Sequence, residues 1–441
     1  MQEPPASARR SRAIKLAYGT SLLSKVATAV VQLLALPFAA RALGVEGFGA
    51  VVTLAAVTSI LYIPALGLSP ATSLIMSQAL GEDRPDQARA VLRDSCRVGF
   101  ASASVLMLLG IALISYVPIH WIYGDGQAIT DTVARTGIAA MWCHVCLAYA
   151  VTFVDGARAS YLQNHVTNLF SFMASIGVIA ATAISVFTGA GIGGFYVAIF
   201  VVPVLFQAIN LVLLLASRRP ELHAAAMIKS DYGRLLSATF SYVKAQAGMV
   251  MHQHGYVYLA TQSMGLAYGA AIGGFLRLFM QVNSLYQSLL NPLVPTLSQA
   301  STAGDSKWLI KSLGAVSIAV GVTLPMMALV LALFGSDVIR IWLDIPMPTT
   351  RWLVPLLAIW GTVGSLALIM FTILMALGRS TLVAYTLLTT GLVSLISNYY
   401  FLDQNMMVAG LTANILLMLV SGFLVPAVVI MLVLRQLRAA G

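Results

Sequence analysis

Three basic side chains interrupt long apolar stretches of this sequence: Lys25, Lys244 and Arg277. A charge inside a hydrophobic span costs roughly 2.5–3.5 kcal/mol on insertion scales, so such a residue marks a functional site by default. Cations at these positions could bind an anionic phosphate, and the planar guanidinium of arginine suits a bidentate contact. The ordinary alternative for each lysine is that its long stem carries the ammonium to the nearer membrane surface.

Amide side chains accompany these cations. They are Gln246, Gln253, Gln262, Gln281, Asn283 and Gln287. Such groups can hydrogen-bond between helices, or they can form a polar cavity wall that meets sugar hydroxyls. The candidate substrate-binding residues are therefore Lys25, Lys244, Arg277 and Gln281.

Catalytic and metal-binding patterns are missing from the sequence. His252 and His254 are two residues apart and point to different helix faces, and Cys143 and Cys146 lack a second ligand pair. The sequence has no Walker, Gly-x-Ser-x-Gly or His-Glu-x-x-His motif. We therefore expect no catalytic residue, no bound metal, no cofactor and no enzymatic activity.

The composition fixes the class of protein. Hydrophobic residues make up 59% of the 441 residues, charged residues make up 9%, and the mean hydropathy is +0.89. Soluble proteins carry about 25% charged residues. Continuous apolar runs long enough to cross a bilayer recur along the chain. The sequence predicts an all-α polytopic membrane protein, and its net charge of +10 is too dispersed for nucleic-acid binding.

Twelve apolar segments must position the candidate residues. Their expected limits are 16–40, 50–79, 96–117, 133–156, 166–188, 194–216, 236–260, 266–293, 311–334, 352–377, 382–402 and 406–433. The connectors between these segments alternate between the two sides of the membrane. Eighteen of the 25 Lys and Arg then fall on the side of the N-terminus, four fall on the opposite side, and three lie inside segments. Basic residues mark the cytoplasmic side, so both termini should be cytoplasmic, and the first span should remain uncleaved in a bacterial inner membrane.

Two short motifs recur at one offset. Gly44 and Gly265 are 221 residues apart, and so are Gln78 and Gln299 within Ser-Gln-Ala triplets. This spacing indicates duplication of a six-span unit, with a parallel repeat and a substrate site between the halves. We expect a lobe over 1–217, a cytoplasmic linker over 218–235 and a second lobe over 236–441.

At these residues the sequence resembles the Wzx-type polysaccharide flippases of the multidrug/oligosaccharidyl-lipid/polysaccharide (MOP) exporter superfamily. The segment from Arg41 to Gly49 is similar to the opening signature of that family, and Gly81-Glu82-Asp83 to its acidic connector. The resemblance implies two six-helix lobes around a central cavity. It also implies translocation of undecaprenyl-pyrophosphate-linked oligosaccharides, with membrane lipids, a polysaccharide polymerase and chain-length machinery as partners.

Other functions compete with this hypothesis. A cation-coupled drug or metabolite antiporter of the same superfamily should carry carboxylates inside its spans. The deepest one here, Asp155, lies at the end of the fourth span and could pair with Arg158. A flippase for lipid-linked peptidoglycan precursors would share the pyrophosphate. A polysaccharide polymerase or ligase should carry a large periplasmic loop, whereas the longest outer connector here is about 20 residues.

Overall fold

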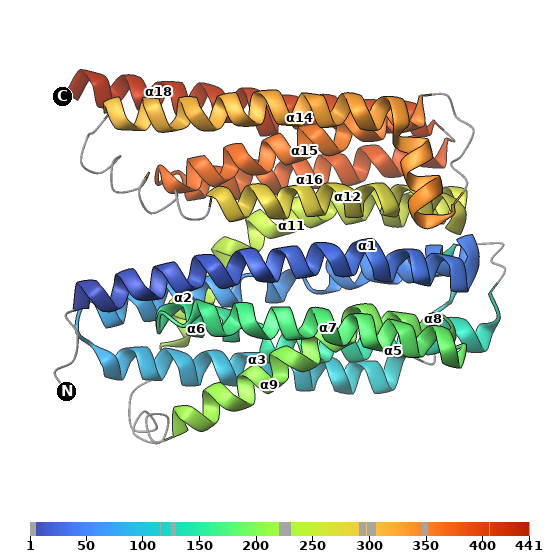
Figure 1. Cartoon of the computed structure of the whole chain (residues 1–441), viewed down its shortest axis with the longest axis horizontal. Helices are drawn as coiled ribbons and strands as arrows, with labels where there is room; N and C mark the ends of the chain where they lie inside the picture. Colours follow the sequence, from blue (N-terminus) through green and yellow to red (C-terminus); the bar gives the residue numbers. More distant parts are fainter. Residues whose placement is uncertain are drawn as a thin grey trace. The chain divides into compact units, whose positions relative to one another are not determined.

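The computed structural model is almost entirely helical and describes residues 6–114, 116–124, 129–219, 231–290, 297, 306–345, 352–404 and 406–440 (Figure 1). Within these ranges there is no strand. Nine of the described helices are long and apolar enough to cross a membrane. The expected all-α polytopic fold is confirmed.

The chain divides into two compact units. Unit 1 comprises Met1–Ile122 and Ala128–Gln246, and unit 2 comprises Tyr123–Gln127 and Ala247–Gly441. Most of the expected linker, residues 220–230, lies outside the described residues. The boundary at Gln246 falls inside one continuous helix, α11 (Tyr232–Met264), whose first half belongs to unit 1 and second half to unit 2.

Unit 1 contains the first six spans. Its helices are α1 (Ala6–Leu61), α2 (Leu68–Gly81), α3 (Pro85–Leu113), α5 (Asp131–Val151), α6 (Val154–Ser160), α7 (Asn164–Thr188), α8 (Gly191–Tyr196) and α9 (Val202–Ser217). Helix α1 packs along α7, α3 packs on α5, and α2 packs on α6. The buried core includes Met76, Leu92, Phe153 and Leu214. Apolar side chains on facing helices therefore hold this unit together.

Unit 2 contains the remaining spans after the first half of α11. Its helices are α12 (Leu266–Leu290), α14 (Ser306–Leu343), α15 (Leu353–Ala376), α16 (Ser380–Asp403), α17 (Met407–Met418) and α18 (Val425–Ala440). Helix α15 is the most buried of the apolar spans in this unit and contacts α12, α14, α16 and α17. The centre of unit 2 therefore lies around α15, and the fully buried Trp360 marks it.

The second predicted span is not one helix. Helix α1 ends at Leu61, a short 3₁₀ turn (Ile63–Ala65) follows, and α2 begins at Leu68. Pro64 lies within the turn, where its missing N–H prevents an uninterrupted helix. The fourth segment is also divided, between α5, which ends at Val151, and α6, which begins at Val154. Residues 115 and 291–293 of the predicted segments, including Pro292, lie outside the described residues.

The repeat inferred from the sequence has structural counterparts. Gly44 interrupts α1 with a φ of 69°, and Gly265 separates α11 from α12 with a φ of 92°. Positive φ is readily available to glycine because it has no Cβ. Both glycines follow the first span of their half, so a glycine with positive φ recurs at the offset of 221 residues.

A second repeated feature is a wide helical turn near each half's last proline. A π-helical turn covers Val197–Val201 before Pro203, and another covers Leu419–Leu424 before Pro426. The N–H of Val202 donates to the carbonyl of Val197, five residues back. Proline cannot donate and its ring clashes with the carbonyl four residues earlier, so a wider turn lets each helix continue through the proline.

Candidate functional site

Arg277 and Gln281 lie one turn apart on α12, so the two side chains share one face of this helix. Both are partly buried, and Arg277 lies near the middle of α12. The neighbouring helix α11 places His254 close enough to Arg277 for their charges to interact. The sequence predicted the residues of this polar face, but not that His254 would adjoin it.

His252 faces a different part of unit 2. Its Nδ1 lies 2.9 Å from Oγ of Ser394 on α16, and its ring packs 5.7 Å from that of Trp360 on α15. Tyr256, one turn further along α11, packs 5.6 Å from the same Trp360 ring. His252 therefore joins α11 to α15 and α16. No group of three metal-ligating side chains occurs among the described residues.

Lys25 and Lys244 both lie in unit 1 by their contacts, although Lys244 belongs to the first span of the second repeat. Lys25 lies near the middle of the part of α1 that precedes Gly44, and Lys244 lies in the first half of α11. Both side chains are partly buried. Whether the two ammonium groups share one cavity stays a prediction.

The hydroxyl groups of two threonines near Lys25 on α1 form hydrogen bonds within α1 and with α7. Thr28 donates to the carbonyl of Ser24 at 2.9 Å and lies 3.4 Å from Oγ of Ser175 on α7. Asn168 on α7 donates to Oγ1 of Thr20 at 3.1 Å. These polar contacts hold α1 against α7. Thr20 and Thr28 are eight residues apart and share one face of α1, which is offset from the face of Lys25.

The expected pairing of Asp155 with Arg158 is wrong. The Arg158 guanidinium is buried and donates to Oδ1 of Asn210 at 3.1 Å, to the Asn210 carbonyl at 3.3 Å and to Oε1 of Gln163 at 2.6 Å. Asp155 is exposed. Arg158 therefore joins α6 to α9 through Asn210 and does not pair with the acid one turn away on its own helix.

A buried polar chain in unit 1 also escaped sequence reasoning. The hydroxyl of Tyr196 on α8 lies 3.0 Å from Nδ1 of His144 on α5 and also hydrogen-bonds Thr58 on α1. The ring of Phe200 stacks on His144. His144 is partly buried, whereas Tyr196 is fully buried. The link ties α1, α5 and α8 together across residues that are far apart in the sequence.

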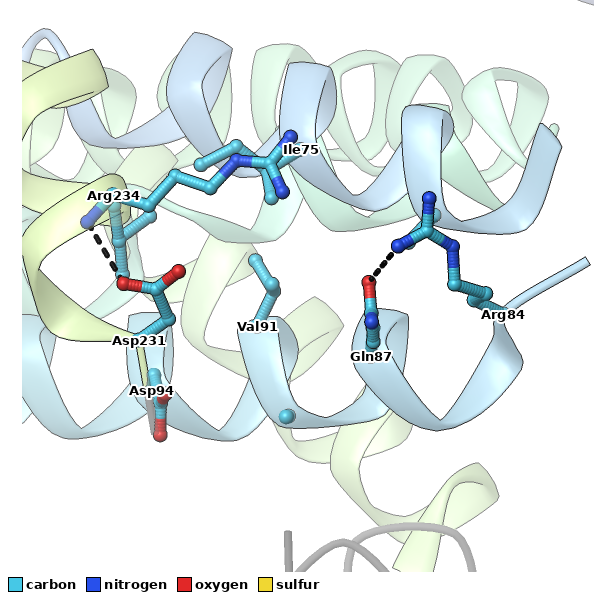
Figure 2. Close-up of a pocket in the computed structure, with 10 residues that line it drawn as sticks. Ile75, Arg84, Gln87, Val91, Asp94, Asp231 and Arg234 are labelled. Carbon is cyan, nitrogen blue, oxygen red and sulfur yellow. Dashed lines mark hydrogen bonds between the residues drawn. The ribbon is translucent and has the colours of Figure 1, made fainter. Parts of the chain in front are cut away.

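A cavity of about 350 Å³ opens between α2, α3 and the start of α11, all within unit 1 (Figure 2). It is lined by Ile75, Ala79, Arg84, Gln87, Ala90, Val91, Asp94, Asp231, Arg234 and Leu235. Charged groups of both signs surround an apolar floor. None of these lining residues was predicted as a site residue, because their charges lie in connectors where solvation is the usual explanation.

Comparisons with known proteins bear on this fold. Residues 21–161 match the family model described as MatE. No protein of curated function matches the sequence significantly. An inward-facing multidrug resistance MATE family transporter of the MOP superfamily shares 14% identity and aligns with a TM-score of 0.73, covering 95% of this chain and 99% of that one.

Two further solved structures resemble the chain. An outward-facing multidrug resistance MATE family transporter shares 14% identity at a TM-score of 0.70, covering 98% of this chain and 96% of that one. A MOP superfamily transporter from Pyrococcus furiosus Vc1, described as having a binding pocket of reverse polarity that suggests a different function, shares 14% identity at a TM-score of 0.68, with 97% of each chain covered. The chain therefore has the fold of MATE transporters, a fold of multi-pass membrane proteins.

Proposed function

We propose that this protein is a flippase that moves undecaprenyl-pyrophosphate-linked oligosaccharide repeat units from the cytoplasmic to the periplasmic leaflet by alternating access. Two repeated six-helix units suit such a mechanism, because rocking about a site between repeats opens it to each side in turn. The protein would act in the bacterial inner membrane with both termini in the cytoplasm. Its product would pass to a polysaccharide polymerase and chain-length machinery.

The distribution of charge within the spans carries this proposal. Arg277 lies at the middle of a helix, and Lys25 and Lys244 lie well inside theirs. Among the described carboxylates, Asp94 lies ten residues into α3 but is paired with Arg93. Asp155 is the second residue of the short helix α6. Cations within the spans favour an anionic substrate group, since a guanidinium or ammonium forms strong charge-assisted hydrogen bonds with phosphate.

The neutral polar groups of unit 2 support the sugar part of the proposal. Gln281 lies beside Arg277 on α12, and Asn283 is buried with an Oδ1 that has no hydrogen-bond partner within the described part of the chain. A buried polar atom without a partner is costly. A substrate rich in hydroxyl groups would supply such partners, whereas an apolar drug would not.

A multidrug or metabolite antiporter is the second candidate. Two of the solved structures with this fold are described as multidrug resistance transporters. In this chain Asp155 is an exposed carboxylate within the fourth span that could serve a coupling cation. The Pyrococcus furiosus protein, however, is described as having reverse pocket polarity and a different function, and the basic spans of this chain favour such a departure from drug export.

Two alanine variants test the choice. In cells that depend on this protein for surface polysaccharide, Arg277→Ala and Lys25→Ala should each reduce polymer by about tenfold or more while protein abundance stays constant. Arg340→Ala is the matched control, because Arg340 pairs with Asp337 at an exposed helix end. Normal polymer in an Arg277→Ala/Lys25→Ala double variant would refute the cationic site, and drug resistance conferred by the wild type would favour the antiporter.

A further inference from the structure

The cavity between α2, α3 and α11 separates its charges into two groups. Figure 2 shows Arg84 and Gln87 at one end and Asp94 and Asp231 at the other, with the side chain of Arg234 extending between them. The apolar floor, which includes Ile75 and Leu235, leaves no further charge between the two ends. A ligand that fills this cavity meets guanidinium groups and carboxylates at once.

The two arginines keep hydrogen-bonding capacity for a ligand. Arg234 donates from Nη2 to the neutral Oε1 of Gln78 at 2.9 Å. Arg84 donates from Nη1 to Oε1 of Gln87 at 3.3 Å and pairs through Nη2 with Glu82, which does not line the cavity. Each guanidinium carries five N–H donors in a planar fork. Further donors of both side chains are therefore available to a phosphate.

The two carboxylates differ in how far neighbouring positive charge neutralises them. Asp94 is buried and forms an ion pair with Arg93 at 2.9 Å. Asp231 is exposed, and its Oδ1 accepts from the backbone N–H of Arg234 at 3.1 Å. A backbone N–H carries no full positive charge, and Asp231 forms no ion pair with another of the described residues. Asp231 is thus the group that would attract a ligand cation.

From the length of α3 we infer that the cavity lies at the level of lipid headgroups. Helix α3 begins at Pro85 and has 29 residues, which corresponds to about 43 Å at 1.5 Å per residue. The hydrocarbon core is about 30 Å thick, so the first turns of α3 extend into the polar layer. Because basic residues cluster here, we expect this end to be cytoplasmic.

We propose that this cavity binds a zwitterionic phosphate–ammonium group, the headgroup of a phosphatidylethanolamine molecule from the cytoplasmic leaflet. Arg84 and Arg234 hold the phosphate through N–H donors, and Asp231 accepts from the ammonium. An anionic headgroup without an amine leaves Asp231 facing a phosphate of like charge. A choline headgroup has no N–H to donate. The lipid would contact α2, α3 and α11, and α11 continues into unit 2. This lipid site is independent of the substrate site proposed above.

The experiment uses the full-length protein in detergent and measures lipid binding by native mass spectrometry. Phosphatidylethanolamine should bind at least tenfold more tightly than phosphatidylglycerol, and soluble glycerophosphoethanolamine should compete only weakly if the membrane lipid is the ligand. Equal binding of the two lipids would overturn the proposal. Competition by the soluble compound at concentrations equal to those of the lipid would assign the site to a free metabolite and overturn the lipid assignment.

Charge variants separate the two ends of the site. Asp231→Asn should weaken phosphatidylethanolamine binding about tenfold and strengthen phosphatidylglycerol binding, whereas Arg84→Gln should weaken both. Asp86→Asn and Arg89→Gln are the matched controls, because these residues pair with each other on α3 outside the cavity lining and carry the same charges. Elution as a single species at the wild-type volume verifies folding. An Asp231→Asn variant with unchanged lipid preference would refute the proposal.

Discussion

Gly67, at the start of α2, lies directly against the backbone of Thr239 on α11. A Cβ placed on Gly67 would be 2.2 Å from the carbonyl oxygen of Thr239 and 2.8 Å from a methyl group of Val243. Side-chain atoms can rotate away from such a contact, but a backbone carbonyl cannot. The break in the second span therefore brings two main chains together, and only glycine leaves room for that approach.

The first prediction follows from this contact. Gly67→Ala should lower the thermal stability of the purified protein, because overpacking against a rigid neighbour costs about 1–3 kcal/mol. Gly321→Ala is the control, since a Cβ on Gly321 in α14 would meet no atom within 4 Å. That variant should be neutral or slightly stabilising, because alanine favours helices by up to about 1 kcal/mol over glycine. Equal melting temperatures for the two variants would contradict the close packing.

The second prediction concerns the buried guanidinium of Arg158. Arg158→Ala should destabilise unit 1 by about 3 kcal/mol, because Asn210 and Gln163 lose a charged donor and each unsatisfied buried group costs about 1–3 kcal/mol. Arg158→Lys should recover only part of this loss, since an ammonium cannot reproduce the fork. The measurement is the thermal midpoint of aggregation in detergent.

Arg218→Ala provides the control for this charge change. The Arg218 guanidinium stacks 4.1 Å from the ring centroid of Tyr161, and a cation–π contact near the surface contributes about 0.5–1 kcal/mol. Its loss should therefore lower stability much less than Arg158→Ala. A larger effect at Arg218 than at Arg158 would indicate that the Arg158 network does not stabilise the unit.

The third prediction is the membrane topology. A cysteine introduced at position 125 should react with an impermeant maleimide added to intact cells, and one at position 225 should react only after the membrane is opened. The reason is the excess of Lys and Arg on the side of the N-terminus. Reaction at position 225 in intact cells would contradict the predicted topology, because it would place that connector outside the cytoplasm.

The helices and their order could be predicted because each apolar run is long and the breaks contain glycine, proline or charge. The sequence singled out Gly44 and Gly265 as a motif repeated shortly after the first and seventh predicted spans, and both have positive φ. The break before α2 was harder to place, since Pro64 within an apolar run is compatible with a kinked helix as well as with a 3₁₀ turn.

Contacts between distant helices could not be predicted. Arg158 was expected to pair with Asp155 because only the neighbouring turn is visible in a sequence, yet its main partner is Asn210, 52 residues further on. Likewise, the sequence identified Arg277 as a charge in a span but gave no sign that His254 lies close enough to interact with it. The grouping of the first half of α11 with unit 1 depends on packing against α2 and α3, for which no motif exists.

The two π-helical turns have a consequence for how this sequence tolerates insertions and deletions. Each turn accommodates one residue more than an α-helix would over the same rise. Deleting one residue within Val197–Val201 would leave the faces of α9 in place, at the cost of the clash at Pro203 that the wider turn relieves. The same deletion in the middle of α7 would rotate everything after it by about 100° about the helix axis, and would turn its buried face toward lipid.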